Sequence, residues 1–153
     1  MIFDTVSLLL KEKDKANLVS VAPTATVADA VRTMNAEKIG AVVVLDGQKL
    51  VGIFTERDVL VRVVGGGRDA LTTRVSEVMT SAVYSIGPAT SIDDALRVMS
   101  KRRFRHVPVE ENGTVRGLIS MGDVTRWVIN SQQEQLNLAI GAVKQMGLSN
   151  RRG

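Results

Sequence analysis

The sequence contains an ungapped internal duplication with a constant offset of 65 positions, so that Pro23 is matched by Pro88 and Gly52 by Gly117. The same offset relates further identical pairs: Asp29 and Asp94, Ala30 and Ala95, Arg32 and Arg97, Met34 and Met99, Val42 and Val107, Val44 and Val109, Asp58 and Asp123. A unit of about 60 residues buries too little surface to be comfortably stable by itself. The duplication therefore predicts two copies that share one interface and form a single module.

Each copy shows the same order of hydrophobic patterns. An apolar stub (18–21 and 83–86) precedes a helix whose apolar positions recur at i, i+3, i+4 and i+7. Two strands follow in each copy (41–45 and 50–54, then 106–110 and 115–119), joined by Asp-Gly and Asn-Gly turn signals. A second helix is expected after Thr55 and after Ser120. The predicted fold class is α+β, with tandem β-α-β-β-α repeats related by a pseudo-two-fold axis.

The predicted boundaries follow from these patterns. Residues 1–64 form the first repeat with an N-terminal segment, 65–73 a glycine-rich linker, and 74–130 the second repeat. Residues 131–153 form an extra C-terminal helix and tail, and Leu136, Ile140 and Val143 lie on one apolar face of that helix. This face is expected either to pack on the module or to contact a second copy.

Composition excludes several classes of function. The chain has no cysteine, which excludes disulfides and thiolate metal sites and fits a reducing compartment. Its single histidine, His106, leaves one possible centre for a His-based triad, and the sequence shows no cluster of metal-ligand type. We therefore expect no enzymatic activity.

Charge and hydropathy limit the partners. No apolar run reaches the roughly 20 residues of a membrane span, and the N-terminus lacks the basic region and cleavage site of a signal peptide. The net charge of +4 comes from bases interspersed with acids, unlike the dense basic stripe of a nucleic-acid binder, and residues 101–105 are the only candidate patch. We expect a cytoplasmic protein with no membrane partner, and nucleic acid is a less favoured partner than a soluble ligand or protein.

The pair Thr55 and Asp58 recurs as Ser120 and Asp123, and this spacing has two interpretations. In a capping box, the hydroxyl residue caps a helix and the acidic residue bonds back to the cap. The same spacing at two other predicted helix starts supports that interpretation: Thr26 with Asp29, and Ser91 with Asp94.

The second interpretation is a ligand site at the turn from strand to helix. Exposed N–H groups at a helix start bind phosphate or hydroxyl oxygens, and an Asp can accept both hydroxyls of a ribose. Gly52 and Gly117 precede the two pairs and leave space for another group to approach the backbone. The residues alone leave capping and nucleotide binding both open.

The Gly-apolar-x-Ser/Thr-x-x-Asp ending on a duplicated β-α-β-β-α unit resembles the CBS domain. The tandem resembles a CBS pair, or Bateman module, of the stand-alone bacterial type over about residues 5–128. Such pairs typically bind adenosine compounds in a cleft between the copies, where the Asp holds the ribose and the Ser/Thr contacts ribose or phosphate. The resemblance thus implies nucleotide contacts from one set of residues: Thr55, Arg57, Asp58, Ser120 and Asp123.

The resemblance also implies contacts from the start of the first hairpin strand, where backbone groups meet the adenine and basic side chains meet the phosphates. The matching positions are Ile39, Gly40, Ala41, Val42, Arg105, His106, Val107 and Pro108, with Ser20 and Ser85 as further candidates for the base. Only the second copy is basic here, which predicts two unequal sites. His106 could instead be a half-buried packing residue.

These expectations describe a regulatory sensor rather than an enzyme. By the resemblance, it binds an adenosine nucleotide, with AMP first and ADP, ATP, NAD or S-adenosylmethionine next. The ligand would favour one arrangement of the module and so signal to an unidentified protein partner. Homodimers are expected. The alternatives are a CBS scaffold for protein interaction without ligand, and a weak nucleic-acid binder.

Overall fold

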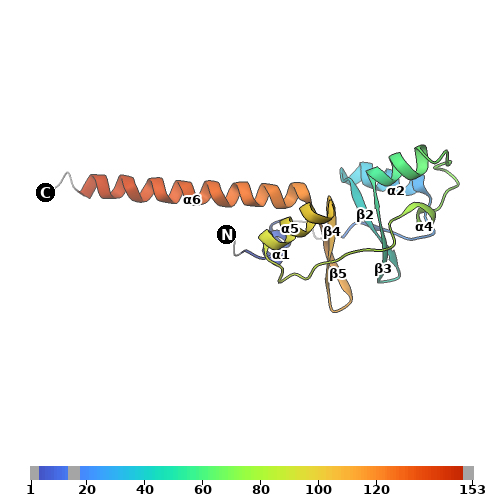
Figure 1. Cartoon of the computed structure of the whole chain (residues 1–153), viewed down its shortest axis with the longest axis horizontal. Coiled ribbons are helices and arrows are strands. Elements are labelled where there is room, and N and C mark those ends of the chain that lie inside the picture. The colour runs from blue at the N-terminus through green and yellow to red at the C-terminus, as the bar shows by residue number, and fades with distance from the viewer. Residues whose placement is uncertain (1–3, 14–17, 150–153) are drawn as a thin grey trace.

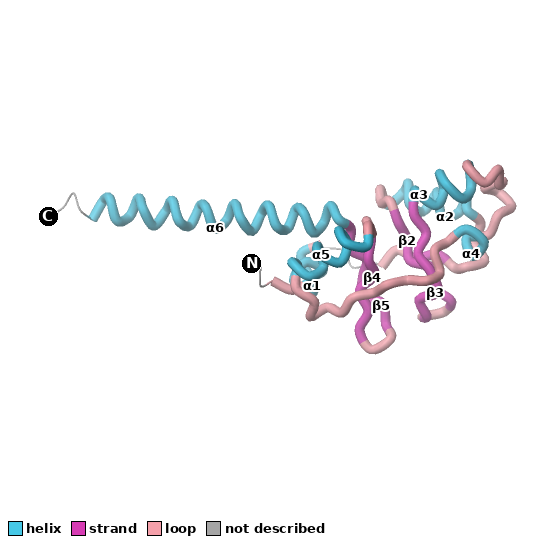
Figure 2. The backbone as a smooth tube through the Cα atoms, in the orientation of Figure 1, coloured by secondary structure: helices cyan, strands magenta, loops and turns pink. Residues whose placement is uncertain are grey.

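Two similar units, each made of a small sheet and helices, lie side by side, and one long helix extends away from the second of them (Figures 1 and 2). The computed structural model describes residues 4–13 and 18–149, with side chains described as far as residue 146. Residues 150–153 of the predicted tail lie outside this range. No helix in the described ranges combines the length and apolarity that crossing a membrane requires.

The two units repeat one order of elements. The first has β1 (Ser20–Val21), α2 (Val27–Glu37), β2 (Ala41–Asp46), β3 (Lys49–Thr55), α3 (Glu56–Asp58) and the π-helical η1 (Val59–Val64). The second has α5 (Ile92–Arg102), β4 (His106–Glu111), β5 (Thr114–Ser120) and α6 (Met121–Ser149). This order confirms the predicted tandem repeat and the α+β class.

Strand pairing is also repeated. In the first unit β1 pairs parallel to β2, and β2 pairs antiparallel to β3. In the second, β4 pairs antiparallel to β5, and Ile86 forms a parallel bridge to Val109 where Val21 pairs with Val44 in the first. Both hairpins have a register shift at the same place, after Val44 and after Val109.

The first helix of each unit forms for the reasons that its sequence indicates. Thr26 and Ser91 cap α2 and α5 by accepting hydrogen bonds from the backbone N–H groups of Asp29 and Asp94, each at 3.1 Å. The predicted apolar face is buried in both helices, at Val27, Ala30, Met34, Ile92, Ala95 and Met99. These residues anchor each helix on the face of its own hairpin.

Two short helices are exchanged between the units. Helix α1 (Val6–Glu12), which comes first in the chain, packs in the core of the second unit, and α4 (Val75–Val78) packs in the core of the first. Matching backbone bonds hold them: Val6 N–H donates to Thr90 O at 2.9 Å, and Val75 N–H to Ala25 O at 2.8 Å. Each short helix therefore precedes one repeat along the chain and packs in the core of the other unit.

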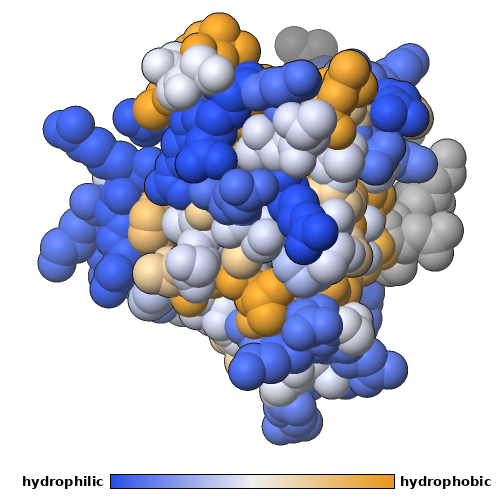
Figure 3. All heavy atoms as spheres, turned by 90° about the vertical axis from the view of Figure 1, so that its right-hand side faces the viewer, coloured by the Kyte–Doolittle hydropathy of each residue, from blue (hydrophilic) through white to orange (hydrophobic). Residues whose placement is uncertain are grey.

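The last helices of the units differ in length. In the first unit η1 ends at Val64, followed by three glycines that do not favour helix. In the second, no proline or glycine cluster interrupts the chain, so the predicted helix over 131–148 is continuous with the repeat helix as α6. At the first-unit end, the surface is largely hydrophilic with separate hydrophobic patches (Figure 3).

Candidate nucleotide-binding cleft

A cavity of about 660 Å³ lies between the two units. One wall comes from the first unit: Gly40, Ile53, Thr55, Glu56, Arg57, Asp58, Val61 and Arg62. The other comes from the second unit and the segment leading into it: Thr80, Ala82, Val83, Tyr84, Arg103, Phe104, Arg105, His106, Pro108, Ser120, Met121 and Gly122. Its volume lies within the range of small-molecule sites, so both repeats can contact one ligand.

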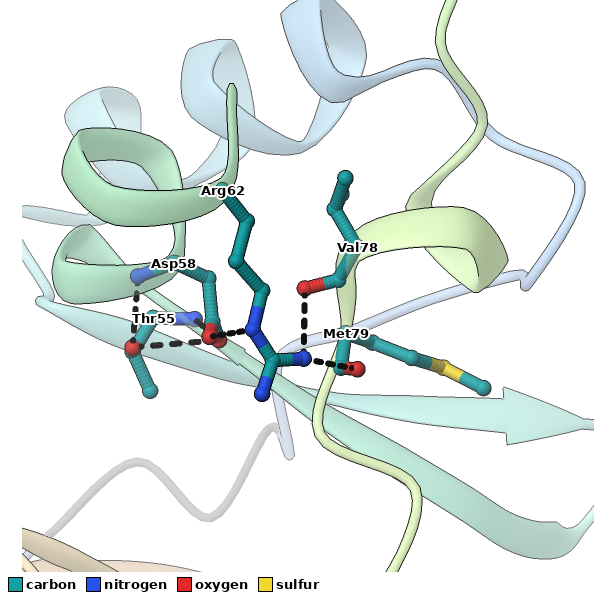
Figure 4. Close-up of polar contacts among 5 residues, drawn as sticks. All are labelled: Thr55, Asp58, Arg62, Val78 and Met79. Atoms are coloured by element: carbon teal, nitrogen blue, oxygen red, sulfur yellow. Dashed lines mark hydrogen bonds and ion pairs between the residues drawn. The ribbon is translucent and has the colours of Figure 1, made fainter. Parts of the chain in front are cut away.

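Thr55 and Asp58 form a complete capping box at the start of α3 (Figure 4). The Asp58 carboxylate oxygen Oδ2 accepts from the Thr55 N–H at 3.0 Å and from the Thr55 hydroxyl at 3.2 Å, while Asp58 N–H donates to Thr55 Oγ1 at 3.3 Å. The predicted capping box is therefore present, and its hydrogen bonds also hold the Asp58 side chain at the edge of the cavity.

The other carboxylate oxygen of Asp58, Oδ1, accepts no hydrogen bond from Arg62. Arg62 Nε lies 3.6 Å from Asp58 Oδ1, longer than a hydrogen bond, while the Arg62 guanidinium donates to Met79 O at 2.7 Å and to Val78 O at 3.2 Å (Figure 4). Arg62 is thus held by main-chain carbonyls beside the carboxylate. Asp58 Oδ1 keeps the capacity to accept hydrogen bonds from a ligand hydroxyl.

The four Ser/Thr-x-x-Asp pairs are not equivalent in the structure. Asp29 and Asp94 are exposed by 52% and 59% and pair with Arg32 and Arg97 one turn further on. By contrast, the Asp58 side chain is only 9% exposed and lines the cavity. Capping alone explains the exposed pairs, whereas Asp58 also has the burial and position of a ligand-binding group.

Positive charge gathers around the same cavity. Arg57, Arg62, Arg103 and Arg105 line it, against the two acidic residues Glu56 and Asp58. Arg103 ends α5 in the left-handed conformation, with φ 57°. Guanidinium groups suit phosphate, which they can bind through paired hydrogen bonds. The cleft is chemically matched to an anionic ligand.

His106 is half-buried at the start of β4, where it lines the cavity. Burial lowers the pKa of His106, and Arg105 and Lys13 lower it further, while Asp123 and Glu56 act in the opposite direction. His106 is therefore neutral at pH 7. It can act there as a hydrogen-bond donor or acceptor.

The His106 shift predicts a pH dependence of stability. The unfolded chain takes up a proton near pH 6.5, whereas the folded chain takes it up only at lower pH, so stability is expected to fall as pH decreases through about 6.5. Urea unfolding midpoints between neutral and mildly acidic pH measure this. Because His106 is the sole histidine, His106→Gln should remove the slope; an equal slope in both proteins would contradict the assignment.

The second motif is closed by a cation from the N-terminal segment. Asp123 Oδ2 accepts from the Ser120 N–H at 2.8 Å and from the Lys13 ammonium at 2.7 Å, and Lys13 also donates to Leu118 O at 2.8 Å. Burial alone would raise the pKa of Asp123, but Lys13 and the Ser120 N–H together hold the pKa below its usual range. The ion pair therefore persists at neutral pH.

Comparison of the repeats shows what Lys13 replaces. In the first unit, Ile53 O accepts from Thr80 N–H at 2.9 Å, and Arg62 lies beside Asp58. At the matching positions of the second unit, the Lys13 ammonium bonds both Leu118 O and Asp123. Lys13 thus bonds the strand carbonyl and the motif carboxylate, which two separate groups contact in the first unit. Asp123 does not line the open cavity.

The close approach predicted at the two glycines exists, but the chain itself fills the space. A Cβ at Gly52 would overlap Met79 Sδ and lie 3.1 Å from Thr80 O, and a Cβ at Gly117 would lie 2.7 Å from Leu10 Cδ2. These neighbours belong to the segments at α4 and α1. The glycines are therefore explained by packing of the exchanged segments rather than by a ligand.

The structure brings about half of the predicted site residues to one cavity: Gly40, Thr55, Arg57, Asp58, Arg105, His106, Pro108 and Ser120. The side chains of Ala41, Val42 and Val107 are buried, and Val42 and Val107 pack in the two cores. The remaining residues do not line this cavity: Ile39, Ser20, Ser85 and Asp123.

Sequence reasoning missed the cavity residues Tyr84, Phe104 and Arg62, and it also missed Lys13, which contacts Asp123 outside the cavity. Tyr84 and Phe104 pack with ring centroids 6.3 Å apart, and the Arg102 guanidinium lies 4.3 Å from the centre of the Tyr84 ring. Arg62 could have been found by its position one turn after Asp58. Lys13 carried no signal, because its contact with Asp123 joins residues 110 positions apart.

Comparison with known proteins identifies the repeats. The model of the CBS domain matches residues 13–65 and 75–130. The chain is 34% identical over 140 residues to the CBS domain-containing protein CBSX3, mitochondrial, of Arabidopsis thaliana, covering 86% of this chain and 68% of the relative.

Solved structures agree. A putative signal-transduction protein with CBS domains from Burkholderia ambifaria superposes with a TM-score of 0.80 at 38% identity, over 84% of this chain and 96% of that one. The CBS domain pair of protein MJ0100 shares the fold, with a TM-score of 0.75 at 21% identity over 84% and 98%. CBS-domain pairs of this stand-alone kind are regulatory modules. The chain belongs to the CBS-domain family and consists largely of one tandem pair of CBS domains.

Proposed function

We propose that the protein is a regulatory sensor that binds an adenosine nucleotide in the cleft between its CBS domains and signals by conformational change. The observation that carries this proposal is the single cavity lined by Asp58 from the first domain and by Arg105 and His106 from the second. Asp58 suits the two hydroxyls of a ribose, and the arginines suit phosphate. We propose no catalytic activity.

The charge of the cleft supports a phosphorylated ligand. AMP is the first candidate by resemblance to the family, followed by ADP, ATP and NAD, and the four arginines that line the cavity suit the phosphate groups of all four. S-adenosylmethionine remains in the set, since the MJ0100 structure is described as a complex with 5′-methylthioadenosine and S-adenosyl-L-methionine. That neighbour's low identity supports the fold alone, so the arginines place the phosphorylated compounds ahead of S-adenosylmethionine.

The exchanged helices support a route for the signal. A ligand in the cleft contacts both domains, and each domain core contains the short helix that precedes the other repeat along the chain. Ligand binding that favours one relative arrangement of the domains would shift the population towards it. A protein partner that binds this arrangement preferentially would then receive the signal. We propose a cytoplasmic location, supported by the absence of cysteine, although the Arabidopsis relative is named as mitochondrial.

Equilibrium dialysis against adenosine, AMP, ADP and ATP tests the proposal. Retention of the phosphorylated ligands, with adenosine retained least, is the expected result because the arginines contribute only when phosphate is present. Equal retention of all four would contradict the assigned role of the arginines.

A scaffold without ligand is the second candidate function, and one observation favours it. Thr55 with Asp58 and Ser120 with Asp123 both form reciprocal capping bonds within the chain. The residues of both motifs therefore have a structural role in starting their helices. The scaffold predicts no binding of any adenosine compound, which separates it from the sensor.

We also propose that Lys13 keeps the Asp123 site closed, so that the unmodified chain binds one nucleotide tightly. Lys13→Gln removes the ammonium from Asp123, and a second, weaker site is expected to appear in a binding titration. Lys11→Gln, an exposed change on the same helix, is the matched control and should keep one site. Two equal sites in the unmodified chain, or one site in Lys13→Gln, would contradict this proposal.

A further inference from the structure

Residues 81–85 join the first CBS domain to the second, and we call them the connecting segment. The chain leaves the first domain at Thr80, which is held to Ile53 by two backbone hydrogen bonds of 2.9 Å, and it enters the second domain at Ile86, which bridges Val109. Between these two anchors, no backbone N–H of the connecting segment donates a hydrogen bond to the backbone of the described chain. A segment held in this way lies at the low end of local stability.

The connecting segment forms part of the wall of the candidate nucleotide-binding cleft. Ala82, Val83 and Tyr84 line the same cavity as Asp58. Figure 1 shows this part of the chain passing from α4 in the first domain to α5 in the second. A ligand that bonds to Asp58 and fills the cavity therefore also meets the connecting segment.

Arg62 links the Asp58 carboxylate to the start of this part of the chain. Its guanidinium donates to Met79 O at 2.7 Å and to Val78 O at 3.2 Å, and its Nε lies 3.6 Å from Asp58 Oδ1 (Figure 4). These are the last two carbonyls before the Thr80 anchor. Because a guanidinium is planar and rigid, one group sets the position of the carboxylate relative to the chain that enters the connecting segment.

The second domain is arranged differently at the matching position. Trp127 occupies the place of Arg62 in the repeat, and its indole Nε1 donates to Asp4 Oδ2 at 2.9 Å, just before α1. In both domains, the residue four positions after the motif aspartate therefore holds the exchanged segment. Arg62 is charged and lines the cavity, whereas Trp127 does not line it. The link between a ligand acceptor and an exchanged segment therefore belongs to the first domain.

We propose that Arg62 is a positioning residue that holds the start of the connecting segment beside the cleft, so that a nucleotide bound at Asp58 orders residues 81–85. This inference rests on the proposed function and names the element that passes the signal between the domains. A ribose hydroxyl would use the free capacity of Asp58 Oδ1, while Arg62 continues to balance the buried carboxylate. The other side of the ligand then packs on a segment whose first anchor is fixed.

Hydrogen–deuterium exchange of the amides of residues 81–85 tests the inference, without ligand and with saturating AMP or ATP. In the unmodified chain, ligand should slow exchange by about tenfold or more, because these amides open freely until the segment is ordered. Arg62→Met removes the charge and the donors at similar length, and at equal occupancy it should leave about twofold protection or less. Its affinity for nucleotide should fall about 3- to 10-fold.

Three further variants separate positioning from charge. Arg57 lines the same cavity, but the carbonyls of Val78 and Met79 accept from Arg62 instead, so Arg57→Met should weaken binding and keep the protection at saturation. Trp127→Phe removes the equivalent bond of the second domain and should change neither quantity. Arg62→Lys keeps a cation without the planar fork, so it should retain more of the affinity than of the protection, which also covers poor folding of Arg62→Met.

The outcomes distinguish this inference from the function on which it rests. If neither AMP nor ATP binds the unmodified chain, the proposed function and the inference are both wrong. If either nucleotide binds but leaves exchange of residues 81–85 unchanged, the inference alone is wrong. Equal protection of this segment in the unmodified chain and in Arg62→Met would likewise show that Arg62 does not position it.

Discussion

Asp58→Asn is expected to weaken adenosine nucleotide binding by roughly 10- to 100-fold, because it replaces a charged acceptor of ribose hydroxyls by a neutral amide. The amide oxygen can still accept the Thr55 N–H bond that closes the capping box, so the protein should remain folded. Calorimetric titration measures the affinity, and thermal unfolding checks the fold.

Asp94→Asn is the matched control for this change. Asp94 occupies the equivalent capping position of α5 and also accepts from a hydroxyl, that of Ser91 at 2.9 Å, but it is exposed and away from the cavity. Its affinity for nucleotide should equal that of the unmodified chain. Asp123→Asn should have a smaller effect than Asp58→Asn because Lys13 already occupies Asp123. Unchanged binding in both Asp58→Asn and Asp123→Asn would show that the site is misassigned.

Gly52→Ala is expected to lower the free energy of unfolding by about 2 kcal/mol, an effect typical of overpacking. The new Cβ would overlap Met79 Sδ and press on the backbone oxygen of Thr80, and Thr80 is held to Ile53 by two backbone hydrogen bonds of 2.9 Å. The backbone at this point has little freedom to move away. Urea unfolding measures the loss.

Gly117→Ala is the natural comparison, because it is the same change at the matching position of the second repeat. Its Cβ meets the end of the flexible Leu10 side chain rather than backbone, so a smaller loss of about 1 kcal/mol is expected. Equal or negligible losses at both glycines would remove the packing explanation and restore a ligand-based one.

Local patterns predicted most of the fold. The helical faces of α2 and α5, their hydroxyl caps and the two hairpins all depend on residues close in sequence, and repetition at a fixed offset made each prediction twice. The exchange of α1 and α4 could not be predicted in this way. The exchange depends on which of two similar cores each short apolar helix enters. The helices that begin at Val6 and Val75 have similar apolar patterns, so the sequence does not assign either helix to a core.

Local patterns also predicted part of the candidate site but not the long-range contacts that complete it. Thr55, Asp58, Arg105 and His106 lie in motifs or at repeat-matched positions, and the structure places all four around one cavity. Local sequence could not predict that Asp58 of the first repeat and the basic residues of the second line the same cavity, because this depends on how the two repeats pack together. Lys13 is the clearest omission, because this one side chain makes two long-range bonds, to Leu118 O and to Asp123, where the first repeat uses two separate groups.

The most direct test of the central claim is calorimetric titration of the full chain with AMP, ADP, ATP, NAD and S-adenosylmethionine. The sensor account predicts saturable binding of at least one phosphorylated adenosine compound at one tight site per chain, lost or strongly weakened in Asp58→Asn. No binding of any of the five compounds would contradict it and leave a CBS scaffold whose motif residues serve only to cap helices.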